Sequence, residues 1–298
     1  MKRRIFLALM AAALSRGAAA QPSGHAVRDL YPRTYDDGII PNFSLELIEI
    51  SAGTDISVAL LDTASARSVQ WNDTARINLD GTVSLLLAAA VLRRVAEGRD
   101  VLDRDVPAAE GLIGQKMTVD ALCAAMMTRG DSTAASLVLG VVGGSDGLTS
   151  FLRDIGDVET EVAATAAQGD DATPGSIRGT TTPCQMLRNL ERLLLGDGLT
   201  ADGKARLLDW KTSNTTGASR LRAGSPEGWI VADVTGQGAY GETSALAAIF
   251  PPDRTPLLMA VYFGRSPRAP GAQDRYFAEL ARIATDNIQE PMEATSHD

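Results

Sequence analysis

The chain has 298 residues, of which 45% are hydrophobic and 22% charged, and its formal net charge is −9. This composition is ordinary for a soluble globular protein and excludes the disordered and fibrous classes. The acidic balance also excludes nucleic acid as an expected partner, because phosphate contacts require clustered Lys and Arg.

The N-terminus has the order of a cleaved secretory signal: Lys2-Arg3-Arg4, an apolar run over residues 5–14, and Ala18-Ala19-Ala20 ahead of Gln21. We therefore expect residues 1–20 to be a signal peptide and the mature chain to be periplasmic or secreted. Cleavage would remove four basic residues and no acidic one, which lowers the formal charge from −9 to −13. Arg3-Arg4-Ile5-Phe6-Leu7 also fits a twin-arginine signal, so two export routes stay open.

Residues 21–42 are polar and contain proline, which predicts an extension without regular structure. A helix is predicted at 43–50, followed by a hairpin with strands at 56–61 and 68–71. The middle of the chain predicts six helices, at 82–97, 118–127, 132–142, 147–155, 183–194 and 201–210. Strand-like runs return at 229–235, 242–250 and 257–263, and the last predicted helix covers 272–288.

Strands at both ends with a helical block between them predict an α+β fold, in which distant segments build one antiparallel sheet beside an all-helical lobe. We assign one domain to 43–290, with its α/β part at 43–71 and 213–290 and its helical lobe at 72–212. Residues 291–298 are a tail. The mature chain has no other run of about 20 apolar residues, so we expect no membrane span after cleavage.

Several short motifs resemble those of one enzyme family in residue type, order and spacing. They are Thr180-Thr181-Thr182-Pro183, Trp210, Asn214-Thr215-Thr216-Gly217, Arg220-Leu221-Arg222-Ala223-Gly224, Trp229, Asp233, Thr235-Gly236, Gly238, Tyr240-Gly241 and Pro251-Pro252. From residue 43 to 288 the chain resembles a class A serine β-lactamase. The resemblance implies a β-lactamase/transpeptidase-like fold. It also places Cys123 and Cys184 on separate helices, which favours two buried free thiols over the disulfide that export would permit.

The same resemblance assigns the catalytic positions to residues that lack the required groups. The nucleophile position is Gly81, and the lysine one turn later is Ser84. The Ser-Asp-Asn motif is Gly130-Asp131-Ser132, and Lys-Thr-Gly is Val234-Thr235-Gly236. Counting back from Pro174-Gly175 and Arg178 puts Ala166 at the glutamate that activates water, Asp170 at the asparagine that helps to hold it, and Ala164 and Gly179 at an Arg–Asp pair.

Amide acyl transfer needs a nucleophile, a base, an acid and an oxyanion hole. Three of these are missing, and what would remain is the oxyanion hole, formed by the backbone N–H groups of Gly81 and Gln237. A relocated mechanism stays open, with Ser84, Ser132 or Thr82 as nucleophile and Asp170 or Asp131 as base. A Ser-His-Asp triad is excluded because the two histidines, His25 and His297, lie in the terminal segments. No His/Cys cluster has metal-ligand spacing, so we expect neither a metal nor a cofactor.

Structural roles compete with functional ones at several of these positions. Ser84 is expected to be a small polar residue on a buried helix, Asp80 and Thr82 to cap that helix, and Asp131 to cap the next one. Arg220 either reaches the carboxylate of a ligand or braces the edge of the sheet.

The leading hypothesis is an exported pseudoenzyme that cannot hydrolyse β-lactams by the acyl-serine route. It would bind a small acidic or peptidoglycan-like ligand in the former cleft, or a protein of the cell envelope. The candidate ligand-binding residues are Gly81, Ser84, Ser132, Asp170, Arg220, Thr235, Gly236 and Gln237. The competing hypothesis is a serine hydrolase with weak or altered activity that uses relocated residues.

Overall fold

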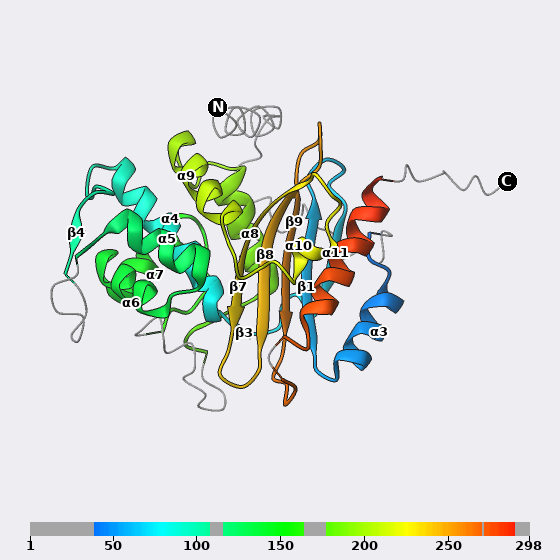
Figure 1. Ribbon diagram of the computed structural model, residues 1–298. Helices are drawn as coiled ribbons and strands as arrows, with labels where there is room; N and C mark the ends of the chain where they lie inside the picture. Colours follow the sequence, from blue (N-terminus) through cyan, green and yellow to red (C-terminus); the bar gives the residue numbers. More distant parts are fainter. Residues whose placement is uncertain (1–38, 108–115, 164–176, 270, 290–298) are drawn as a thin grey trace.

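The computed structural model describes residues 39–107, 116–163, 177–269 and 271–289 (Figure 1). Its centre is a five-stranded antiparallel sheet in the order β2-β1-β9-β8-β7. The strands are β1 (Ile56–Asp62), β2 (Ser68–Trp71), β7 (Ile230–Gln237), β8 (Thr243–Phe250) and β9 (Leu257–Phe263). The N-terminal hairpin pairs with the last strand of the chain, as Ile56 lies opposite Phe263. The predicted α+β fold, with one sheet built from distant segments, is confirmed.

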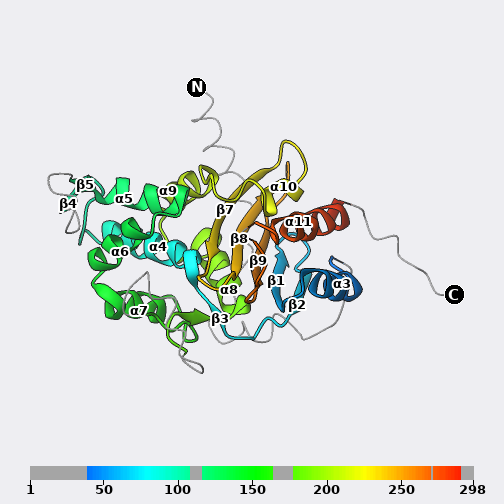
Figure 2. The same ribbon diagram turned by 60° about the horizontal axis from the view of Figure 1, so that its bottom comes forward.

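Two helices, α3 (Asn42–Ala52) and α11 (Asp274–Gln289), cover one face of the sheet (Figure 2). Alternate residues of β1 and β9, such as Val58, Leu60, Met259 and Val261, face these helices, as the period of two in a strand requires. We call this cluster the outer core. Ile39 and Ile40 belong to it, with at most 1% of their surface exposed. The prediction that the extension continues to residue 42 is therefore wrong at its end, because this apolar pair is buried.

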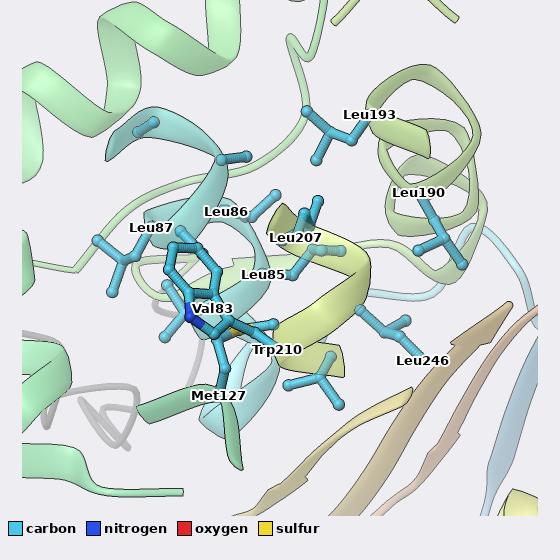
Figure 3. Close-up of a cluster of buried hydrophobic side chains, with 14 of the residues drawn as sticks. Val83, Leu85, Leu86, Leu87, Met127, Leu190, Leu193, Leu207, Trp210 and Leu246 are labelled. Carbon is cyan, nitrogen blue, oxygen red and sulfur yellow. The ribbon is translucent and has the colours of Figure 1, made fainter. Parts of the chain in front are cut away.

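The opposite face of the sheet packs against the second hydrophobic cluster, which we call the inner core. It joins the sheet to α4 (Val83–Ala96), α5 (Val119–Arg129), α6 (Ser132–Val141), α7 (Gly144–Asp154), α8 (Pro183–Leu194) and α9 (Ala201–Thr212). Figure 3 shows how Leu85 of α4, Leu190 of α8, Trp210 of α9 and Leu246 of β8 converge there. Helix α8 packs directly on β1, β8 and β9.

Helix α4 runs through the centre of the inner core, and every residue from Val83 to Leu92 is buried. A helix surrounded by protein has no polar face, which accounts for the uninterrupted apolar run 85–92. Across the described residues, no single helix has the length and apolar character needed to cross a membrane. The bent pair α6 and α7 reaches that threshold only when its two helices are taken together.

The sequence did not predict the short elements, which are η1 (Asp80–Thr82), α10 (Leu221–Gly224), β3 (Ile77–Asn78), β4 (Asp105–Val106), β5 (Met117–Thr118) and β6 (Thr180–Thr181). Elements of two to four residues are too short to show a hydrophobic period, so only their pairing partners define them. Strand β3 pairs with β6, and β4 pairs with β5.

The two thiols lie on separate helices and are free, as expected. Cys123 on α5 is buried, whereas Cys184 on α8 is only half-buried. Burial raises the pKa of Cys123 to about 12 and that of Cys184 to about 11. Both groups are therefore protonated near neutral pH and are poor nucleophiles.

Candidate active site

Gly81 lies in the 3₁₀ turn η1, which leads into α4, and strand β7 packs directly against this turn. A Cβ added at Gly81 would lie 2.5 Å from the backbone oxygen of Thr235 and 2.9 Å from Cα of Gly236. Both contacts are with backbone atoms, which cannot rotate away as the end of a side chain can. Any larger residue at position 81 therefore requires η1 and β7 to move apart.

The turn that holds Gly81 is also unusual in its own backbone. Asp80 has a φ of 42°, in the left-handed region that non-glycine residues rarely adopt. The Thr82 hydroxyl donates to the backbone oxygen of Leu79 and lies 3.4 Å from the hydroxyl of Tyr262. Thr82 stands at the predicted N-cap position of α4, but the expected side-chain cap is absent, because its hydroxyl bonds backwards into the turn.

Ser84 follows one turn of helix after Gly81 and is 4% exposed within the apolar stretch of α4. This burial agrees with the expected role of a small polar residue on a buried helix. The hydroxyl is therefore closed off from bulk solvent, whereas a hydrolytic reaction needs water to reach it.

The junction of α5 and α6 holds Gly130, Asp131 and Ser132. Gly130 ends α5 in the left-handed conformation, with φ at 66°. Asp131 is the N-cap of α6, and its carboxylate accepts a hydrogen bond of 2.9 Å from the backbone N–H of Ala134. This confirms the predicted cap. Ser132 is exposed at the start of α6.

Strand β7 carries the residues Val234, Thr235, Gly236 and Gln237. Val234 is 2% exposed and packs in the inner core, so an alkyl side chain stands at this place in the strand. The Thr235 hydroxyl lies 2.6 Å from that of Thr216, and Gln237 is exposed at the end of the strand. The strand therefore presents hydroxyl and amide groups but no cation at these four positions.

Arg220 is 6% exposed, and protein groups hold its guanidinium on several sides. Nε donates to Asp274 at 2.9 Å, and Nη1 donates to the backbone oxygens of Gly236 and Ser244, each at 2.8 Å. The guanidinium also lies 5.2 Å from the ring centre of Phe277. These contacts favour the bracing role over ligand binding, because Arg220 ties β7 and β8 to the start of α11.

The sequence did not predict that a lysine is buried beside β7. Lys211 on α9 is fully buried, and its Nζ has no hydrogen-bond partner in the described part of the chain. Burial lowers the pKa of Lys211 to about 8, although the negative charge of Asp233 opposes the shift. The spacing of Leu207 and Lys211, four residues apart on a helix, was the available signal that this lysine faces inward.

Asp233 on β7 is completely buried, and it bonds both to the segment that follows α9 and to α10. Its Oδ1 accepts hydrogen bonds from Arg222 at 2.5 Å and from Asn214 at 3.3 Å. A Cβ added at Gly217 would lie 1.7 Å from Oδ2 of Asp233. Close packing around this carboxylate accounts for the Asn and Gly of the motif 214–217.

The positions 164, 166 and 170 lie outside the described residues, so Ala164, Ala166 and Asp170 receive no structural account. Gly179 is described, with a φ of 70°, and its backbone oxygen accepts a hydrogen bond of 2.9 Å from Leu79. Among the described residues, no group of three or more His, Cys, Asp or Glu side chains is placed to hold a metal ion.

Comparison with known proteins identifies the family to which this fold and these motifs belong. The family described as "Beta-lactamase enzyme family" matches residues 44–288. A β-lactamase from Citrobacter koseri is 32% identical over 291 residues, which cover 94% of this chain and 97% of that protein. A β-lactamase from Amycolatopsis lactamdurans is 37% identical over 75% of this chain and 77% of that protein.

Solved structures agree with the sequence matches. The class A β-lactamase of the last common ancestor of Gram-negative bacteria is 40% identical, with a TM-score of 0.79 over 83% of this chain and 98% of the other. The chain belongs to the class A β-lactamase family. A β-lactamase from Xanthomonas campestris, 31% identical, superposes with a TM-score of 0.80 over 85% of this chain and 98% of the other. The family match over residues 44–288 includes Gly81, the α5–α6 junction and β7, so all of the described site lies within the family domain.

Proposed function

We propose that this chain is an exported class A β-lactamase-like protein that does not hydrolyse β-lactams through an acyl-serine and instead acts by binding. The observation that carries the proposal is that a Cβ added at Gly81 would lie only 2.5 Å from the backbone oxygen of Thr235. The position that the family resemblance assigns to the nucleophile has no side chain and no room for one.

The other positions assigned by the resemblance support the same proposal. Ser84 is a buried alcohol where the family has a lysine, and Val234 is an alkyl group in the inner core. Gly130 lacks the hydroxyl that would deliver a proton to the leaving nitrogen. The members of a catalytic constellation act as a unit, so losing the nucleophile removes most of the rate, and the further losses add little.

The packing at β7 also bears on whether a carbonyl binds between Gly81 and Gln237. A Cβ added at Gly236 would lie 2.8 Å from the backbone N of Gly81, so the two backbones are in contact there. An oxyanion hole needs an open space in front of its donors. We therefore place ligand binding outside the contact between Gly81 and Gly236, and an oxyanion hole formed by Gly81 and Gln237 stays a prediction.

A chromogenic cephalosporin assay, combined with intact-mass spectrometry after incubation with penicillin, tests the loss of hydrolysis. We expect no turnover above that of buffer and no covalent adduct. An adduct on the unsubstituted protein would overturn the proposal.

Serine variants separate this proposal from the competing hypothesis of relocated chemistry. If turnover exists and disappears in Ser132→Ala or Ser84→Ala, the protein is a serine hydrolase with a displaced nucleophile. Ser136→Ala is the matched control, because Ser136 lies one turn further along α6 and its hydroxyl donates to the backbone oxygen of Ser132. The expected result is that all three variants behave as the unsubstituted chain does.

Export and binding need separate tests. Expression in a Gram-negative host, followed by mass spectrometry of the periplasmic fraction, is expected to give a chain that begins at Gln21. A thermal-shift screen against muropeptides and acidic small molecules tests binding, because a ligand of the folded state raises its melting temperature. An uncleaved chain that still carries residues 1–20 and stays in the cytoplasm would contradict the export part of the proposal.

A further inference from the structure

A pocket of about 530 Å³ opens between the turn joining β7 to β8 and the segment joining β9 to α11. Both connections lie at the lower end of the sheet in Figure 1. Pockets that bind small molecules typically measure about 300–1,000 Å³, so this one has the volume for an organic ligand. It lies at the end of β7, where Gln237 belongs to its lining, and it does not include Gly81, Ser84 or Ser132.

The charge of this pocket is opposite to that of the molecule. Its described lining includes Arg265 and Arg268 and no Asp or Glu, although the chain carries a net charge of −9. Nε of Arg265 lies 3.2 Å from Oε1 of Glu242, and its guanidinium stands 4.6 Å above the ring of Tyr240. Glu242 therefore partly neutralises the charge of Arg265, and the Tyr240 ring holds its guanidinium at one side of the pocket.

Arg268 supplies the uncompensated positive charge. Its guanidinium makes no hydrogen bond or ion pair with the described residues, and it lies against Gly53 at the end of α3. The nearby carboxylate of Asp274 is held by Arg220 and Ser219. An exposed guanidinium at a pocket without a carboxylate is available to a ligand.

Gln273 adds an uncharged donor to the same pocket. It is 3% exposed, and its Oε1 accepts a hydrogen bond of 2.6 Å from the Thr243 hydroxyl. That bond orients the amide, and Nε2 has no hydrogen-bond partner in the described part of the chain. A buried donor without a partner is uncommon in native proteins and is satisfied when a ligand supplies an acceptor.

We propose that this pocket binds a small organic carboxylate of about the size of a dipeptide. Arg268 pairs with the carboxylate through its planar guanidinium, which matches the two oxygens of that group. Gln273 donates to an oxygen of the ligand, and Tyr240 with Arg265 forms the opposite wall. This site rests on the binding part of the proposed function, to which it gives a ligand class, and does not depend on the loss of hydrolysis.

Isothermal titration calorimetry with an N-acetylated dipeptide tests the assignment, using the free carboxylate and its C-terminal amide as a matched pair. The carboxylate is expected to bind, and the amide to bind at least about tenfold more weakly, because a charge-assisted hydrogen bond is lost. Added salt is expected to weaken the binding of the carboxylate. Inorganic phosphate serves as a second anion.

Arg268→Ala is expected to lower the affinity for the carboxylate about tenfold or more, and Gln273→Glu to abolish binding by adding a negative charge. Arg282→Ala is the matched control, because it removes one exposed arginine of α11 away from the pocket. Equal binding of acid and amide, tighter binding of phosphate, no binding at millimolar dipeptide, or equal affinities in Arg268→Ala and Arg282→Ala would each overturn the proposal. Hydrolysis of a cephalosporin would overturn only the proposed function.

Discussion

At the scale of single residues, glycine is a packing requirement at position 81, which the family resemblance assigns to the nucleophile. Its Cα faces the backbone of β7 at a distance that leaves no space for a methyl group. Overpacking against a backbone forces a shift of whole elements, which costs more than moving one side chain.

We predict that Gly81→Ala lowers the free energy of unfolding by about 2 kcal/mol, measured by urea denaturation. The matched control is Gly140→Ala on α6, where the added Cβ would meet no atom within 4 Å apart from the adjoining backbone of its own helix. That change is expected to be neutral or to stabilise by about 0.5–1 kcal/mol, since alanine is the better helix former. Equal effects at the two glycines would show that β7 does not press on η1.

Lys211 provides a second prediction at the residue scale. Its pKa is about 8 in the folded chain and 10.5 as the ordinary value. Between these values the unfolded chain holds a proton that the folded chain has lost, so stability increases as pH rises. From pH 7 to 9 we expect a gain of about 1 kcal/mol relative to Lys211→Met.

The measurement is the difference in unfolding free energy between the wild type and Lys211→Met at each pH. Taking the difference cancels the opposite contribution of the two cysteines, whose raised pKa values reduce stability above about pH 9. A difference that does not change with pH would mean that Lys211 is solvated or fully paired.

At the scale of elements, one side chain links the end of the sheet to the helix that covers it. Arg220 bonds the carbonyls of Gly236 on β7 and Ser244 on β8 and pairs with Asp274 at the start of α11. Removing it leaves one carboxylate oxygen of Asp274 and two backbone carbonyls without this donor, although Ser219 still bonds the other carboxylate oxygen. Breaking one partner of a buried pair typically costs about 3–5 kcal/mol.

We therefore predict that Arg220→Ala destabilises the protein by about 3 kcal/mol, measured by thermal or urea unfolding. Arg282→Ala breaks an exposed pair with Asp286 on the same helix and is expected to cost less than about 0.5 kcal/mol. If Arg220→Ala kept full stability and lost only carboxylate binding, the ligand-binding alternative for Arg220 would be favoured.

At the scale of the whole molecule, the two cores share a single sheet, because alternate residues of β1 and β9 enter the outer and the inner core. Loss of either core exposes one face of the same strands. We expect one cooperative unfolding transition, detected at the same denaturant concentration by far-ultraviolet circular dichroism and by tryptophan fluorescence.

The tryptophans make this prediction specific to each core. Trp210 lies in the inner core, and Trp71 and Trp229 pack against the outer core. A Trp210→Phe variant therefore reports the outer core, and a Trp71→Phe/Trp229→Phe variant reports the inner core. If the fluorescence midpoints of the two variants differ by more than their circular-dichroism midpoints do, the two cores unfold independently.

The long elements could be predicted from the sequence alone, because hydrophobic periodicity and capping residues are local properties. Helix 183–194 was predicted at both of its boundaries, where Thr182 caps it and Pro183 occupies its first turn. The positions that the resemblance assigns to the catalytic groups could also be read from the sequence, since the motifs around them set the register. Regions such as 21–42 gave no equally local signal, and the burial of Ile39 and Ile40 was missed for that reason.

Tertiary structure alone decided how the site positions pack and what they contact. The contact between Gly81 and Thr235, the commitment of Arg220 to Asp274, and the pocket between the β7–β8 turn and the start of α11 each join segments that are far apart in the chain. Periodicity shows which side of an element is buried but not what it meets or how closely. Those distances follow from how two cores pack on one shared sheet, and that packing depends on the whole chain at once.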